Sequence, residues 1–203
     1  AWSFTWGLPY LRLNLQWHRA TGLWFSVVSL LVALSGIGLA MYSDLFRPVV
    51  NAVSPISPTV WNQRAAETDR TVNEAEISFD EGLAAAKAHA ASVGISRGPT
   101  EVWYSDYRGL YRIGFGSRLE AGPGISEVYV DTMSGEVAGH AVAGTGSVGD
   151  KLDFAIQPLH SGRIIGMPGR IIVFVLGLAV ALLATTGVLM WLRKRGMRKG
   201  VSQ

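Results

Sequence analysis

Residues 171–192 read IIVFVLGLAVALLATTGVLMWL, an apolar run that contains no charged side chain. As a helix that rises 1.5 Å per residue, this run is long enough to cross a hydrocarbon core of about 30 Å. A second such run, TGLWFSVVSLLVALSGIGLAMY, occupies residues 21–42. A buried helix of a soluble domain needs only about half this length. The two runs therefore predict transmembrane helices over residues 20–43 and 170–192.

The overall composition agrees with a membrane protein. Of the 203 residues, 49% are hydrophobic and only 16% are charged, which is unusual for a soluble chain of this size. The chain has no cysteine, which excludes disulfides and thiolate metal sites. Histidine, carboxylate and methionine remain as candidate metal ligands.

Basic residues lie at those ends of the two runs that face the termini. Arg12 and Arg19 precede the first run, and RKRGMRKG follows the second at residues 193–200. Short flanks rich in Lys and Arg stay on the cytoplasmic side of a membrane. We therefore expect both termini in the cytoplasm and the middle of the chain on the opposite face. The basic flanks account for most of the formal charge of +3 and are explained by membrane orientation, so we predict no nucleic-acid partner.

The middle of the chain alternates between helix and strand patterns. Ser78 followed by Glu81 is a capping-box sequence, and apolar residues recur at helical spacing from Phe79 until Gly94. Period-two patterns and turn residues then predict strands over 101–107, 110–115, 127–131 and 136–140. We expect Gly135 to occupy the left-handed position of the last turn. One helix on a small antiparallel sheet is an α+β domain.

The expected organisation follows from these observations. Two transmembrane helices flank a small extracytoplasmic α+β domain, with aromatic residues of the N-terminal arm at a membrane interface. The predicted segments are the cytoplasmic interfacial arm 1–19, helix 20–43, connector 44–76, α+β domain 77–142, return linker 143–169, helix 170–192 and basic cytoplasmic tail 193–203.

Three motifs give the chain a resemblance to a known family. They are Trp17-His18-Arg19 with Gly22-Leu23, VYVD at 128–131 with SGEV at 134–137, and LHSG at 159–162 with GMPGR at 166–170. The sequence resembles the PepSY-associated transmembrane proteins. That family includes inner-membrane haem proteins and ferric-siderophore reductases, which usually repeat the helix–domain–helix unit twice. This chain is similar to one unit, the C-terminal half.

The resemblance implies a PepSY-like domain in the periplasm, a location in the bacterial inner membrane, and haem b as a cofactor. The positions that match the family's axial haem ligands are His18 and His160. Neutral imidazole suits haem iron, and a histidine at a membrane boundary favours a functional role. The alternative without a cofactor is that both histidines only anchor the helices at the membrane interface.

Topology limits how the two histidines can act. His18 precedes a helix that runs outward and His160 precedes one that runs inward, so they lie near opposite faces and cannot share one haem. Each would need a second axial ligand from another copy, another subunit, a missing half of the chain, or methionine. On depth alone, Met41 matches His160 and Met190 matches His18.

These observations favour an inner-membrane electron-transfer protein, and leave open whether it is an enzyme. One alternative is a non-catalytic accessory subunit of a larger membrane complex, and another is a PepSY-type protein that binds or inhibits a peptidase. The expected partners are membrane lipid and either a second copy or another integral membrane subunit. Helix contacts are indicated by small residues at intervals of three or four: Ser29, Ala33, Gly36 and Ala40, and Gly177, Ala181 and Thr185.

Overall fold

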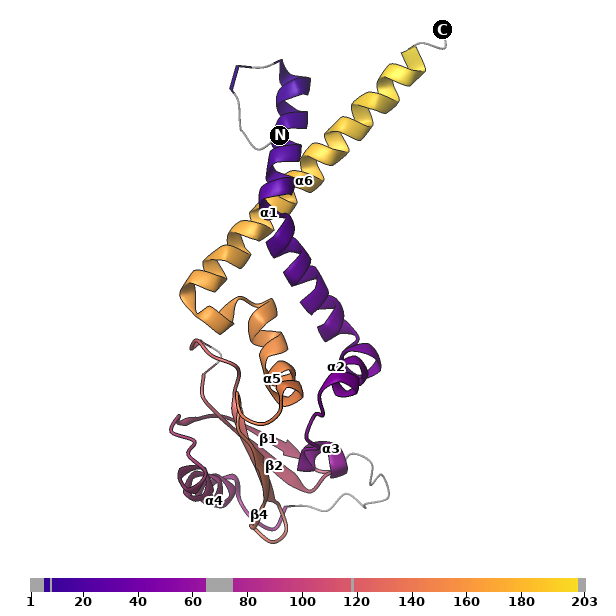
Figure 1. Cartoon of the computed structure of the whole chain (residues 1–203). Coiled ribbons are helices and arrows are strands. Elements are labelled where there is room, and N and C mark those ends of the chain that lie inside the picture. Colours follow the sequence, from indigo (N-terminus) through magenta and orange to yellow (C-terminus); the bar gives the residue numbers. More distant parts are fainter. Residues whose placement is uncertain (1–5, 8, 65–74, 118, 201–203) are drawn as a thin grey trace.

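The computed structural model describes residues 6–7, 9–64, 75–117 and 119–200; the predicted arm, connector and tail lie partly outside these ranges. Two long helices cross, a small sheet domain lies at one end, and the start of α1 and the end of α6 lie toward the other end (Figure 1). The elements in chain order are α1 Tyr10–Ala40, the π-helix η1 Tyr42–Phe46, α2 Arg47–Val53, α3 Val60–Arg64, α4 Phe79–Ser92, β1 Pro99–Ser105, β2 Leu110–Phe115, β3 Ser126–Asp131, β4 Val137–Ala141, α5 Val148–His160, the 3-10 helix η2 Arg163–Ile165 and α6 Met167–Gly200.

Helices α1 and α6 are long and apolar enough to cross a membrane, over Arg12–Ala40 and Met167–Arg195. In their most apolar stretches only 11% and 17% of the residues are buried by the rest of the chain. A core helix of a soluble protein would be mostly buried. Leu34 on α1 and Phe174 on α6, for example, are 57% and 67% exposed. The exposed apolar faces of α1 and α6 are suited to contact with lipid rather than with water.

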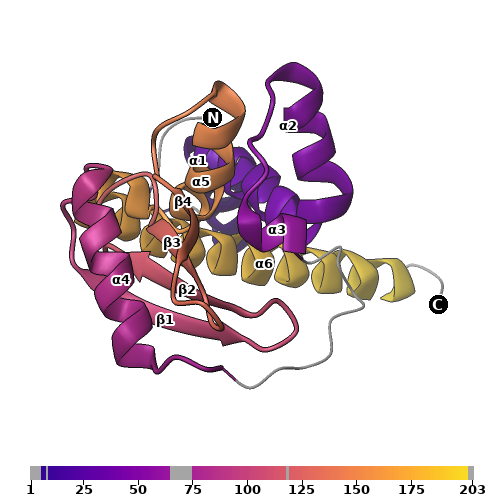
Figure 2. The same ribbon diagram turned by 90° about the horizontal axis from the view of Figure 1, so that it is seen from below.

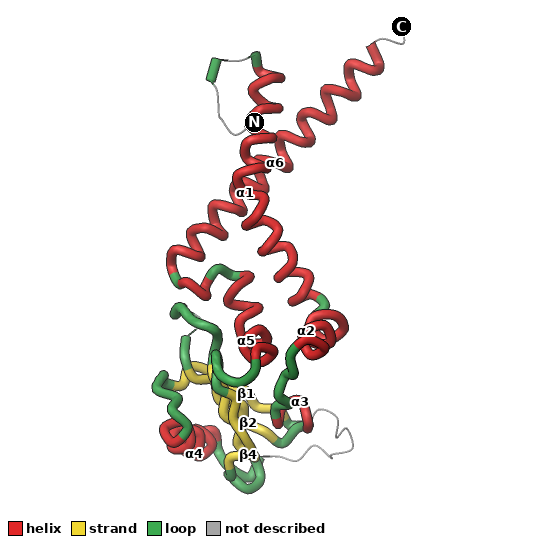
Figure 3. The backbone as a smooth tube through the Cα atoms, viewed as in Figure 1, coloured by secondary structure: helices red, strands yellow, loops and turns green. Residues whose placement is uncertain are grey.

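The two long helices touch where they cross. Small and polar residues lie at this contact: Ala20 and Thr21 are almost fully buried, and Gly22 faces Leu183 of α6. The α1 and α6 ribbons then diverge toward the sheet domain, and α5 lies between the divergent parts (Figures 1 and 3). The tube drawing also shows that strands are confined to the sheet domain.

Helix α5 occupies the segment that the sequence predicted as the return linker 143–169. Ser147 caps it, and Asp150 completes a reciprocal capping box. Its apolar residue Ile156 packs so closely on Gly38 of α1 that a Cβ there would lie 2.8 Å from the Ile156 Cδ1. The glycine-rich run GTGSVG at 144–149 is typical of a loop, whereas the Ser147 cap and the packing on α1 stabilise a helix.

A tight reversal joins α5 to α6. Gly162 and Gly166 have φ of 72° and 74°, in the left-handed region that a side chain disfavours. Gly162 also lies against Gly169, where an added Cβ would lie 1.9 Å from the Gly162 carbonyl oxygen. These glycines allow the chain to return toward the crossing within a few residues.

The sheet domain confirms the predicted α+β fold. Four antiparallel strands follow the order β1-β2-β3-β4, and β2 pairs with β3 so that Ile113 lies opposite Val128. The predicted capping box forms at Ser78, and Gly135 has φ of 74°. The core between α4 and the sheet contains Ala86, Ala90, Ile95, Tyr111, Ile113, Phe115, Val128 and Val130.

The second face of the sheet does not belong to this core. Helices α4 and α3 lie on opposite sides of the sheet (Figure 2). Trp61 of α3 lies over this second face, with its ring 6.4 Å from that of Tyr129 and 4.8 Å from the Arg112 guanidinium carbon. Because successive strand residues point to opposite faces, β2 buries Ile113 against α4 and presents Arg112 toward α3.

Candidate functional site

The His18 ring extends from α1 to α6 at the helix crossing. Its Nδ1 lies 2.9 Å from the Thr186 Oγ1. That hydroxyl has one proton, which we assign to its hydrogen bond with the Leu182 carbonyl oxygen at 2.7 Å. The Thr186 oxygen therefore accepts from the His18 Nδ1–H. In this neutral tautomer, Nε2 carries the lone pair that a metal ion binds.

The His160 ring extends from the end of α5 to α1. Its Nδ1 lies 3.1 Å from the Val32 carbonyl oxygen and 3.1 Å from the Ser35 Oγ. A carbonyl oxygen can only accept, so Nδ1 carries the proton. The Ser35 hydroxyl donates to the Leu31 carbonyl oxygen at 2.8 Å and can also accept from the ring. His160 therefore has the same tautomer as His18, with its Nε2 lone pair available.

A glycine lies beside each hydroxyl. A Cβ on Gly36 would lie 3.1 Å from the His160 Cε1, and a Cβ on Gly187 would lie 3.5 Å from the His18 Cε1. Both rings are half-buried. The arrangement is the same at both sites, since each ring lies against a hydroxyl–glycine pair of another helix. The spacing of small residues predicts that Gly36 contacts a neighbouring helix, and it contacts His160 of α5. A Ser-Gly pair and a Thr-Gly pair within the apolar helices are the sequence features that could have indicated these two histidine contacts.

The two sites are well separated. His18 contacts α6 at the crossing, whereas His160 contacts α1 at residues 32–36, 14 to 18 positions after His18. At 1.5 Å per residue, this is about 21–27 Å along the α1 axis. The structure therefore does not bring His18 and His160 together. We call them the crossing site (His18, Thr186, Gly187) and the sheet-side site (His160, Val32, Ser35, Gly36).

Comparison with known proteins assigns the chain to a family. The model of the PepSY-associated TM region matches residues 1–194, and no curated protein matches the sequence. The chain belongs to the PepSY-associated transmembrane family. This family member is therefore a membrane protein in which α1 and α6 are the two candidate spans, and their exposed apolar faces contact lipid.

Each of the two sites in this family member offers one nitrogen donor of the type that haem iron accepts as an axial ligand. Each site offers one neutral imidazole Nε2, and its Nδ1–H is held by an oxygen, as is typical of metal-binding histidines. The described residues contain no group of three or more His, Cys, Asp or Glu that could hold a bare metal ion. Met41 lies five residues after Gly36, and Met190 three residues after Gly187. These offsets are about 7 and 4 Å along a helix axis.

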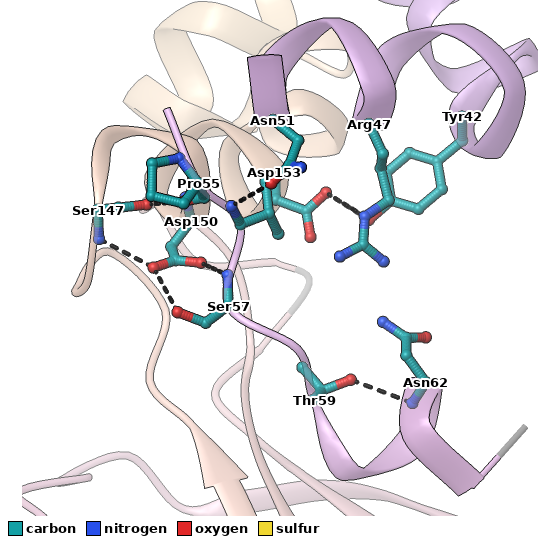
Figure 4. Close-up of polar contacts among 11 residues, drawn as sticks. Tyr42, Arg47, Asn51, Pro55, Ser57, Thr59, Asn62, Ser147, Asp150 and Asp153 are labelled. Carbon is teal, nitrogen blue, oxygen red and sulfur yellow. Dashed lines mark hydrogen bonds and ion pairs between the residues drawn. The ribbon is translucent and has the colours of Figure 1, made fainter. Parts of the chain in front are cut away.

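A group of polar contacts ties α5 to the start of the connector in this family member (Figure 4). The Asp150 carboxylate accepts hydrogen bonds from the Ser57 N–H at 2.6 Å, the Ser57 hydroxyl at 3.0 Å and the Ser147 N–H at 2.9 Å. One turn later Asp153 accepts from the Tyr42 hydroxyl at 2.6 Å, and Arg47 lies 3.8 Å away. We call these contacts of Asp150 and Asp153 the latch.

The latch changes the acidity of its members. Burial disfavours the charged form of Asp150, but its hydrogen bonds from Ser57 and Ser147 outweigh this, and its pKa lies below the ordinary value of 3.8. Burial raises the pKa of Tyr42 far above its ordinary 10.0, and the hydrogen bond to Asp153 raises it further. At neutral pH the latch therefore holds a carboxylate and a protonated phenol.

A cavity of about 610 Å³ lies between the latch and the second face of the sheet. Its walls include Tyr42, Arg47, Asp153, Arg112, Tyr129 and Arg163. Arg163, one of these lining residues, follows His160 by three positions in the chain. Charged groups of both signs line it, which suits a polar ligand.

Proposed function

We propose that this protein is a haem-binding electron-transfer protein of the bacterial inner membrane, similar to one half of a ferric-siderophore reductase. His18 and His160 each supply one axial ligand to a different haem b. The observation that carries the proposal is that both Nδ1–H groups are fixed by oxygen acceptors, which leaves Nε2 as the donor at each site.

Bound haem would supply one-electron chemistry between the ferric and ferrous states. The residues of the chain perform three tasks toward it. The oxygens of Thr186, Ser35 and Val32 set the tautomer and the direction of each ring. They also raise the basicity of Nε2, since they accept the proton on the other ring nitrogen. The apolar surfaces of α1 and α6, in lipid, exclude water.

Basic flanks support the proposed orientation. Arg12 and Arg19 lie before the first apolar run, and Arg193 and Lys194 follow the second. We infer from the positive-inside bias that the termini are cytoplasmic and the sheet domain is periplasmic. The crossing site then lies toward the cytoplasm and the sheet-side site toward the periplasm, which places one electron carrier in each leaflet.

A second axial ligand comes from a neighbouring helix in this proposal. One face of α6 is available for such a neighbour: a Cβ on Gly177 would meet no described atom within 4 Å, and Ala181 and Thr185 are exposed. Small residues allow close approach of helices in lipid. A second copy of the chain, or another integral membrane subunit, fits this face. Met41 and Met190 are the ligands that the chain itself could offer.

One observation favours an alternative function. Each ring already satisfies its Nδ1–H with an oxygen and packs against a glycine, so the histidines could act as contacts that join helices. The chain would then be an accessory subunit without haem. A reduced-minus-oxidised visible spectrum of the protein, extracted from its native membrane in mild detergent, separates these functions. Sharp b-type bands support electron transfer. Their absence from a folded protein supplied with haem would contradict it.

A further inference from the structure

The sheet domain contains a second pair of histidines besides His18 and His160. His89 lies in the last turns of α4, and His140 lies in the edge strand β4. The His89 Nε2 is 3.0 Å from the His140 Nδ1. The two ring centroids are 5.0 Å apart, with an interplanar angle of 52°. His140 is exposed and His89 is half-buried, so the pair is accessible from solvent.

We propose that His89 and His140 form a bidentate surface site for a divalent transition-metal ion of the Cu2+ type. With metal–nitrogen bonds of about 2.0–2.1 Å, nitrogen atoms 3.0 Å apart subtend an angle of about 90–97° at the metal. This angle matches neighbouring positions of a square-planar or tetragonal site, which Cu2+ and Ni2+ prefer. It is smaller than the angle of about 109° in a tetrahedral zinc site.

Metal binding requires only a local change in the pair. Without metal, one ring donates its N–H to the other, so one of the two facing nitrogens carries a proton. That proton moves to the outward nitrogen of the same ring when the metal binds, and both rings turn so that the two lone pairs converge on the metal instead of pointing at each other. The elements that carry the rings are already packed, since α4 covers the sheet to which β4 belongs. Little ordering is therefore needed on binding.

Water would complete the coordination sphere. In the described part of the chain, no third His, Cys, Asp or Glu joins the pair. Two imidazoles and water favour Cu2+ over the softer Cu+ and over Mg2+ or Ca2+, which prefer oxygen ligands. Among divalent first-row ions of this type, Cu2+ binds nitrogen ligands most strongly. The site is independent of the proposed haem ligands.

The test is Cu2+ titration of the full chain in detergent, followed by electron paramagnetic resonance. We expect one axial Cu2+ signal per chain with hyperfine coupling to two imidazole nitrogens. His89→Gln and His140→Gln should each reduce this to one nitrogen and weaken binding at least about tenfold. Lys87→Gln, two residues from His89 on α4, should change neither property. Circular dichroism of each variant establishes that it is folded.

Three results would overturn the site. One is a wild-type chain with no stoichiometric Cu2+ signal. Another is a two-nitrogen signal that persists in either folded histidine variant. The last is a loss of signal in Lys87→Gln equal to that in the histidine variants, because this would show a charge effect rather than ligation.

Discussion

The crossing site and the sheet-side site use the same hydroxyl–glycine arrangement but depend on different parts of the fold. His18 belongs to α1 itself, and the direct crossing of α1 with α6 places it. His160 belongs to α5, which is joined to the connector by the latch. His160 has two acceptors, whereas His18 has one. The crossing site is therefore positioned by α1 and α6, whereas the position of the sheet-side site also depends on α5 and on its contacts with the connector.

Removal of the latch should distinguish the sites most strongly. Asp150→Ala leaves the Ser57 and Ser147 donors without their acceptor, and we expect a loss of stability of about 2–4 kcal/mol. Because α5 carries His160, the sheet-side haem should be lost or become heterogeneous while the crossing-site haem remains. Haem content and low-temperature spectra of the variant measure both effects.

A matched control for this variant is available in η1. Asp44 is exposed on the same side of the chain, and its conversion to alanine should leave both sites unchanged. Equal loss of both haems in Asp150→Ala, with the protein still folded, would show that the two sites are not separately supported.

The acceptors of the two rings should differ in importance. Thr186→Val removes the one oxygen that holds the His18 Nδ1–H, whereas Ser35→Ala leaves the Val32 carbonyl oxygen in place for His160. Loss of an outer-shell partner typically weakens metal binding about 10–100-fold. We expect such a loss at the crossing site in Thr186→Val and little change in Ser35→Ala. Haem retention during dilution into apo-myoglobin measures it, and the reverse order would refute the hydrogen-bond assignment.

The smallest expected effect is the response of the latch to pH. The pKa of Asp150 is lowered by folding, so its contribution to stability is complete above the ordinary value of 3.8 and is lost as pH falls below it. The pKa of Tyr42 is raised, so its contribution is present below 10.0 and is lost at higher pH. The sheet-side site should be stable between these limits. In Asp150→Asn the acid-side loss should disappear, as thermal melts at several pH values would show.

The parts of the fold that the sequence predicted are those with local causes. Uncharged runs identify the membrane helices, Ser78 with Glu81 identifies the start of α4, and Gly135 identifies a turn. Each of these signals lies within one continuous stretch of the chain. Helix α5 lies in the predicted return linker 143–169, where the glycine-rich run at 144–149 is typical of a loop, whereas Ser147 and Asp150 form a capping box that starts a helix.

The surroundings of the candidate site could not be read in the same way. His18 meets Thr186 across 168 positions, and His160 meets Ser35 across 125. Such pairs depend on the angle at which α1 and α6 cross and on the depth of α5, which the local pattern does not specify. The motifs identified the histidines, whereas only the packed helices show which oxygen fixes each tautomer.

In the proposed function, His18 and His160 ligate two separate haems. The direct measurement is the haem content of His18→Ala and His160→Ala, by pyridine haemochrome assay and spectral redox titration against the wild type. We expect each variant to lose one haem per chain and to keep the other, because the two sites share no residue. Loss of both haems in either folded variant, or retention of both in each, would contradict it.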